Sequence, residues 1–173
     1  MTRKHLFLAA LLFLIFASCK KSGISFTISN QTTFRVESTS PLSLPFEVAT
    51  PDVTTNSSKE FENNRTSSGL IKEVNLEELK LTITNPSGKT FSFIKSIQLF
   101  ISTNNSDEIE LATLDNITSA AQTISLAPSQ QNLDKYIKAS SYKIRTKLVT
   151  KETLTQAIDI RADLKFRIKA SLL

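Results

Sequence analysis

Apolar and polar residues alternate along most of this chain after residue 23. The clearest run is 158–170, where seven apolar residues alternate with six charged ones. The apolar set is Ile158, Ile160, Ala162, Leu164, Phe166, Ile168 and Ala170. Strict period-two alternation predicts a β-strand with one face on a core and the other in water, as antiparallel sheets have.

Shorter alternating runs occur throughout the rest of the chain. They lie at 24–28, 34–36, 74–84, 91–101, 109–113 and 142–148, with further extended pieces at 117 and 123–126. Only 133–138 favours a helix, of one or two turns, where Asn132 can accept hydrogen bonds from the first turn. About eight to ten strands predict an all-β fold, an antiparallel β-sandwich that is either immunoglobulin-like or jelly-roll.

Local breaks in the alternation predict turns and irregular strands. The apolar parity changes at Glu77 and Glu78, which predicts a β-bulge there. Lys95 stands on the apolar parity of its run, so we expect a bend or an edge position. Asn-Pro-Ser-Gly at 85–88 predicts a turn that leads to a return strand from Phe91, and 104–107 predicts another turn.

Two further stretches are irregular. Pro41 and Pro45 suit an edge strand or a connector, because proline cannot donate to a sheet ladder. Residues 49–69 are the most polar part of the chain and predict a long surface loop, with a short strand around Phe61.

The N-terminus has the order of a secretory signal. Arg3 and Lys4 precede an apolar run from Leu6 to Phe16, and small residues follow. The run has 11 residues, whereas a membrane-spanning helix needs about 20. We therefore expect residues 1–18 to be a signal peptide, 19–23 a short tether, and 24–173 a single domain.

Residues Phe16-Ala17-Ser18-Cys19 resemble the lipobox of bacterial lipoproteins, although the family prefers Leu where Phe16 stands. The resemblance implies that Cys19 is lipidated and becomes the first mature residue. Lys20 follows where an Asp would favour the inner membrane, so the resemblance implies the outer membrane of the cell envelope. We expect the domain to face the periplasm, with the cell surface as the alternative location. A plain signal peptide that leaves Cys19 as a free thiol in the mature protein is a further alternative.

A second resemblance is faint and covers about a quarter of the chain. The run from Leu79 to Asn85-Pro86, with the strand from Phe91 after it, resembles the desiccation-linked LEA14-like sandwich domains. It implies no function here.

Composition removes most catalytic chemistry from the mature chain. The single histidine is His5 and lies in the signal, and Cys19 is the one cysteine. No nucleophile–base pair, zinc ligand set or glycine-rich phosphate loop is recognisable, so we expect no cofactor and no metal. The acidic clusters at 77–78 and 107–110 leave a carboxylate hydrolase as a third hypothesis, and calcium at the 104–107 turn as a minor one.

Basic residues on the last two strands form the best candidate binding strip. They are Lys143, Arg145, Lys147, Arg161, Lys165, Arg167 and Lys169. If the two strands pair as a hairpin with Leu148 opposite Ile158, Lys147 faces Asp159 and Lys143 faces Asp163. Lys165, Arg167 and Lys169 then stay positive and attract an anionic lipid, a glycan or an acidic protein. The alternative is a solvated face that discourages aggregation.

Nucleic acid is not expected as a partner, because the aromatic residues lie on core parity rather than between the basic ones. The chain is thus expected to be a lipid-anchored, non-enzymatic binding or structural accessory module of the envelope, joined to the membrane through Cys19. The alternative is a periplasmic carrier of an apolar acyl chain held inside the sandwich.

Overall fold

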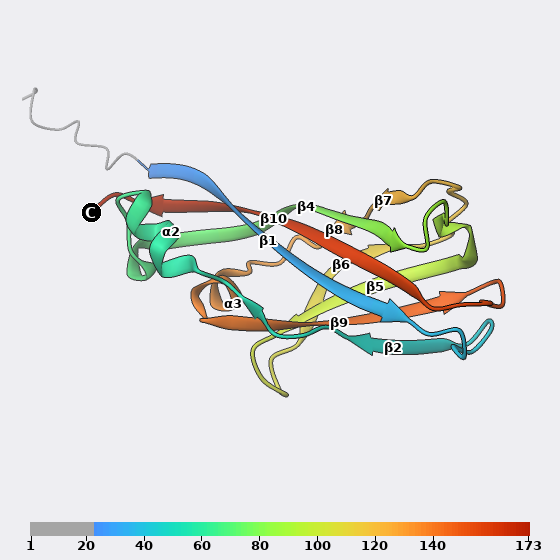
Figure 1. Ribbon diagram of the computed structural model, residues 1–173. Helices are drawn as coiled ribbons and strands as arrows, with labels where there is room; N and C mark the ends of the chain where they lie inside the picture. Colours follow the sequence, from blue (N-terminus) through green and yellow to red (C-terminus); the bar gives the residue numbers. More distant parts are fainter. Residues whose placement is uncertain (1–22) are drawn as a thin grey trace, which may run out of the picture.

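The computed structural model describes residues 23–173, and the predicted signal peptide and lipidation site lie outside these residues. Two antiparallel sheets pack face to face (Figure 1). In the first, the order is β1 (Gly23–Val36), β10 (Ile158–Ser171), β4 (Ile71–Asn85) and β7 (Thr123–Ser125). In the second, it is β2 (Pro45–Ala49), β9 (Ser141–Thr150), β5 (Ile94–Ser102), β6 (Ile109–Leu114) and β8 (Ala127–Pro128). The two-residue strand β3 (Val53–Thr54) continues along β9 beyond β2.

Eight of these strands form one long antiparallel ribbon that is folded in half and rolled up. The ribbon doubles back at the β5–β6 turn. As a result β5 pairs with β6, β4 with β7, β2 with β9 and β1 with β10. Rolling this ribbon produces two Greek keys and the strand order of a jelly roll. The all-β sandwich predicted from the sequence is confirmed, and of its two forms the strand order selects the jelly roll.

One contiguous core lies between the sheets. The apolar face of β10 is buried along its whole length, from Ile158 to Ala170. Tyr142 of β9 meets Phe166 of β10 edge-on, with ring centroids 6.2 Å apart, so that the contact joins the two sheets. Burying a side chain of this size contributes about 1.5–3 kcal/mol.

The bulge predicted at Glu77 and Glu78 is present, whereas at Lys95 the expected edge position is wrong, because β5 lies between β9 and β6, and the irregularity there is a second bulge. On β10, Lys165 pairs with Glu78 while Phe166 pairs with Leu76, so Glu77 is the extra residue of a bulge. The bulge at Lys95 lies on β5, since Ile94 and Ser96 pair with consecutive residues of β9. The parity change at Glu77 and the charged residue on the apolar parity at Lys95 therefore each correspond to a single inserted residue.

The surface loop predicted for residues 49–69 is wrong, and so is the strand around Phe61. The segment contains β3, helix α2 (Ser57–Asn63) and the start of a 3₁₀ turn at Ser68–Leu70. Phe61 is 2% exposed and packs edge-on against Phe26 of β1. Buried Thr55 and Thr66 donate to the carbonyls of Ala139 and Ser171, both at 2.6 Å. The polar stretch thus closes one end of the sandwich through hydroxyl groups, which a hydrophobic pattern does not register.

The return strand predicted from Phe91 is also misplaced. A turn at 85–88 is present, with a cis Asn85–Pro86 bond and Gly88 at φ +76°, but the chain then crosses to the other sheet. Phe91–Phe93 forms a 3₁₀ turn, and both phenylalanines are fully buried. These two rings fill the end of the sandwich opposite α2. The apolar alternation at Phe91 and Phe93 therefore comes from packing in a turn and not from a strand.

The other local predictions agree with the structure. Helix α3 (Asp134–Lys138) starts one residue later than expected, and Asn132 accepts a hydrogen bond from the Asp134 amide. The 104–107 turn joins β5 to β6, and Pro45 begins an edge strand.

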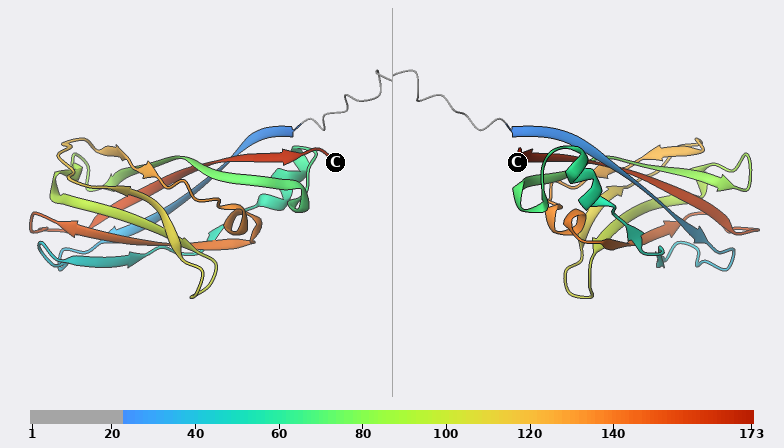
Figure 2. Two further views of the ribbon diagram at one scale, coloured as in Figure 1. Left: turned by 180° about the vertical axis from the view of Figure 1, so that it is seen from behind. Right: turned by 60° about the vertical axis from the view of Figure 1, so that its left-hand side comes forward.

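The first and last described strands run side by side for their full length, so Gly23 pairs with Ser171. Figure 2 shows the start of β1, the C-terminus and α2 together at one end in both views. We call this the tether end. The opposite end carries the connections 37–44, 86–90 and 151–157, and we call it the far end.

Substitutions at two tyrosines should change the free energy of unfolding in opposite directions. The Tyr142 hydroxyl is buried without a hydrogen-bond partner among the described residues, and burial raises the pKa of Tyr142. The Tyr136 hydroxyl instead donates to the carbonyl of Asp107 at 2.5 Å. We expect Tyr142→Phe to raise the free energy of unfolding by about 1 kcal/mol and Tyr136→Phe to lower it by about 1 kcal/mol. Denaturant titration measures both, and losses of equal size would contradict the assignment.

Candidate functional site

The predicted hairpin between the last two strands is wrong. β9 and β10 lie in different sheets, and the connection 151–157 crosses between them at the far end. Lys147 faces Glu47 and Gln98, whereas Asp163 faces Gln31 and Lys80. Sequential strands are usually neighbours, but in a rolled ribbon the last two strands sit on opposite layers. The seven basic residues are therefore split into two groups.

The β10 group is paired with carboxylates, most of them from β4. Glu77 contacts Arg167 at 2.8 Å and Lys165 at 3.4 Å, and Glu73 contacts Lys169 at 2.9 Å. Arg161 pairs with Asp163 of its own strand at 2.9 Å. The residues predicted to stay positive are thus largely neutralised across the outer face of the first sheet.

The β9 group is organised around Arg145. Its guanidinium bridges Glu47 of β2 and Glu108, with shortest contacts of 2.5 Å to each, and lies over the Phe100 ring, 4.3 Å from its centroid. Hydrogen bonding to Arg145 holds the pKa of Glu108 below its ordinary value. Lys143 and Lys147 make no ion pair within 4 Å in the part of the chain described. Arg145 thus ties three segments of the second sheet together.

A cleft of about 540 Å³ lies on the outer face of the first sheet, beside the bulge. Its lining comes from three strands: Ser29, Asn30 and Gln31 of β1, Glu78 and Lys80 of β4, and Arg161, Asp163, Leu164 and Lys165 of β10. Gln31 donates to Asp163 at 3.0 Å. Amides, hydroxyls and charges of both signs suit a polar ligand held by hydrogen bonds.

The bulge also places the two carboxylates of the hydrolase hypothesis on one face. Both Glu77 and Glu78 stand opposite the outward-facing Lys165. Glu77 is engaged by two cations, and Glu78 is in contact with Lys80. A glycosidase needs two carboxyls that face a substrate across a cleft, whereas these two are occupied by ion pairs within the sheet. The geometry therefore suits charge pairing better than acid catalysis.

Asp107, the centre of the other acidic cluster, serves to close the β5–β6 turn. Its Oδ1 accepts from the amides of Thr103 and Asn104 at 2.8 and 3.0 Å, and its Oδ2 contacts Lys135 at 2.8 Å. Burial raises the pKa of Asp107, but these hydrogen bonds outweigh it and hold the pKa well below its ordinary range. Among residues 23–173, no three metal-ligating side chains of the His, Cys, Asp or Glu types gather into one group.

Two surfaces were not indicated by the sequence. The outer cleft depends on the register between three strands, for which no single strand carries a signal. The exposed leucines of the tether end, Leu172 and Leu173, extend the last strand and look like ordinary core residues in a pattern. Within the described part of the chain, every helix is too short or too polar to cross a membrane.

Comparisons with known proteins identify no family. No family model matches the chain, and no curated protein matches it. Two plant-virus structures are similar in outline. Desmodium yellow mottle tymovirus is 10% identical, with 88% of this chain and 90% of that chain covered at a TM-score of 0.31. Turnip yellow mosaic virus is 14% identical, with 87% and 96% covered at a TM-score of 0.26. At these TM-scores the likeness carries no inference about this protein.

A double-mutant cycle tests whether the β10 cations are neutralised. Glu77→Gln removes the partner of Lys165 and Arg167 and should lower the free energy of unfolding by about 0.5–1 kcal/mol. The cycle of Glu77→Gln with Arg167→Gln should give a favourable coupling energy that shrinks in high salt. Glu110→Gln, at a carboxylate without an ion pair in the described part, is the matched control. Zero coupling would mean that these cations are free for an external partner.

The Asp107 network predicts a pH-dependent effect. We expect Asp107→Asn to lower the melting temperature at about pH 7, because hydrogen bonds to the charged carboxylate are lost. The folded-state pKa lies below the unfolded value of about 3.9, so the carboxylate's contribution is complete above that value and declines as the pH falls below it. The difference between wild type and variant should therefore narrow towards about pH 3. Asp115→Asn at an exposed site serves as control, and a difference independent of pH would refute the assignment.

Proposed function

We propose that this protein is a lipid-anchored module of the bacterial cell envelope that works by binding or by structural support and not by catalysis. The observation that carries the proposal is the sequence Phe16-Ala17-Ser18-Cys19 after a basic start and an apolar run. A mature chain without histidine, and with its one cysteine acylated, fits a role by contact.

The proposed location is the outer membrane, with the domain facing the periplasm. Lys20 directly after Cys19 supports the outer membrane within the lipoprotein resemblance, and Lys21 adds a second positive charge. Two or three acyl chains on one cysteine attach a protein durably, because one chain alone binds only marginally. The membrane is thus the first partner, and an envelope protein or a glycan is the second.

The cleft beside the bulge is the best surface for that second partner. Its polar lining and paired charges suit hydrogen bonds to a sugar or peptide, and charges of both signs discriminate among partners more than they attract any one of them.

The carrier alternative receives no support from the described residues. Ligand pockets for apolar molecules are mostly apolar, whereas five clefts of the described residues are each lined at least half by polar or charged side chains. Between the sheets, bulky side chains such as Phe91, Phe93 and Phe166 are fully buried. A contact surface is therefore preferred to an internal site.

Metabolic labelling with a radioactive fatty acid tests the anchor. We expect the wild-type protein to incorporate label and to float with membranes, and Cys19→Ala to lose both, because the thioether is the attachment point. Ser22→Ala, three residues further on, should keep full labelling. Incorporation into Cys19→Ala at the wild-type level would refute the lipobox interpretation.

A further inference from the structure

The two ends of the described chain meet at one end of the sandwich. Gly23 pairs with Ser171, so the tether enters beside the last strand. From Cys19 to Gly23 there are four Cα–Cα steps, which span at most about 14 Å when fully extended. β10 alone has 14 residues and is about 46 Å long. An anchor at Cys19 therefore holds the tether end close to the bilayer and leaves the far end tens of ångströms away.

Exposed leucines stand on that same end. Among the described residues, Leu172 is 44% and Leu173 is 83% exposed, although they follow a strand whose other apolar residues are buried. Their backbone is held in place, because the Leu173 amide donates to the Arg65 carbonyl at 3.0 Å and Thr66 donates to Ser171. Two apolar side chains are thus presented to solvent on a fixed support.

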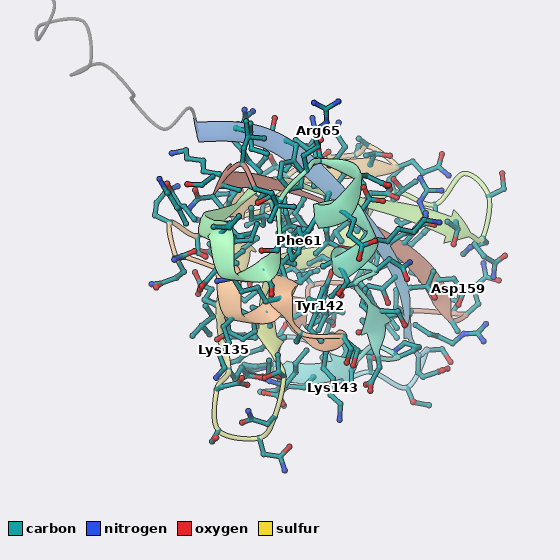
Figure 3. The ribbon with its side chains drawn as sticks, turned by 90° about the vertical axis from the view of Figure 1, so that its left-hand side faces the viewer. Phe61, Arg65, Lys135, Tyr142, Lys143 and Asp159 are labelled. Atoms are coloured by element: carbon teal, nitrogen blue, oxygen red, sulfur yellow. The ribbon has the colours of Figure 1, made fainter. Side chains whose placement is uncertain are left out.

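Three basic residues stand on segments of the same end as the leucines, and the backbone carbonyl of one of them, Arg65, accepts a hydrogen bond from the Leu173 amide. Lys59 on α2, Arg65 after it and Lys72 at the start of β4 are exposed and form no ion pair within 4 Å in the part described. Figure 3 looks onto this end, with Arg65 at its upper edge. The tether adds Lys20 and Lys21 beside Cys19. Glu60 and Glu62 on α2 offset part of this charge, so apolar contact has to supply much of the attraction.

We propose that the tether end is a membrane seat, formed by Leu172, Leu173, Lys59, Arg65 and Lys72, which rests on anionic lipid headgroups. The leucines enter the interfacial layer while the cations face the phosphates, as in proteins that combine apolar and basic contacts. The inference rests on the proposed acylation of Cys19. A short tether raises the effective concentration of the lipid surface at this end, so even a weak seat is occupied.

The seat fixes the orientation of the domain. β10 and its neighbours run away from the bilayer, so the outer cleft faces sideways along the membrane and the far-end loops project into the periplasm. A partner that uses the cleft approaches laterally.

The test uses the intact acylated protein in vesicles of phosphatidylethanolamine and phosphatidylglycerol. Cys19 is the one native cysteine and is blocked by acylation, so a cysteine introduced at Ser68, in the tether-end 3₁₀ turn, accepts an environment-sensitive fluorophore specifically. A second protein carries the fluorophore at Ser87 in the far-end turn. Quenching by lipids that bear a nitroxide should be strong for Ser68→Cys and near zero for Ser87→Cys.

The leucines are then tested directly. Leu172→Ser and Leu173→Ser are added to the protein labelled at Ser68→Cys. They should lower the ratio of membrane-docked to undocked tether ends about tenfold, as read from the quenching of this probe. The matched control, Leu42→Ser with Leu44→Ser, removes the two exposed leucines of the far end and should leave the quenching unchanged. Because all four leucines are exposed, folding measured by circular dichroism should be unaffected.

Mass spectrometry of the same samples separates the two proposals. If Cys19 carries acyl chains but the Ser68 and Ser87 probes are quenched equally, or the leucine substitutions change nothing, the seat is wrong and the anchor stands. A mature protein without acyl chains would refute both.

Discussion

The pairing of β1 with β10 is the constraint on which the rest of this structure depends. It joins the first and last strands of the described chain across 14 registered positions, from Gly23 with Ser171 to Val36 with Ile158. Such pairing closes a very long loop, and its entropic cost grows only slowly with loop length. Once formed, it fixes the positions of both chain ends, the buried face of β10 and the site where α2 closes the sandwich.

The same register determines the electrostatics of the outer face. β10 carries six charged residues on its polar side, and its neighbour β4 places carboxylates beside three of the cations. The bulge at Glu77 matters here, because an extra residue on β4 lets one carboxylate reach both Lys165 and Arg167. The last strand is therefore rich in basic residues, but ion pairs within the sheet neutralise most of their charge. The cations of the tether end without an ion pair in the described part then contribute more to the surface charge.

What the sequence predicts well here is information held within a single strand. The parity change at Glu77 and the misplaced charge of Lys95 each correspond to an inserted residue, and the alternation along 158–170 corresponds to one buried face. Which strands pair with each other is not contained in the pattern of any one strand. The patterns of β9 and β10 are those of a hairpin, although the two strands belong to opposite sheets. Helix α2 was missed because Thr55 and Thr66 are buried through their hydroxyls, so its segment contains few apolar residues.

For the candidate site the same division applies. The proposed lipidation motif lies within four consecutive residues and needs no fold to be proposed, whereas the outer cleft exists only where β1, β10 and β4 lie side by side. Leu172 and Leu173 follow an alternating strand, and their exposure becomes evident only from the structure.

A two-sheet domain has edge strands with free backbone groups, and these edges have to be protected against pairing with other chains. β1 is an edge strand without a charge from Ile24 to Phe34, a composition that invites pairing with another strand. The segment 54–61 lies against it, through the Phe26–Phe61 contact and the hydrogen bond from Asn30 to the Thr54 carbonyl. On the other sheet, the edge strand β2 is bounded by Pro45 and Pro51, which cannot donate to a ladder. The polar segment that closes the tether end thus also covers the uncharged edge of the first sheet, so one segment both completes the packing at that end and protects the edge.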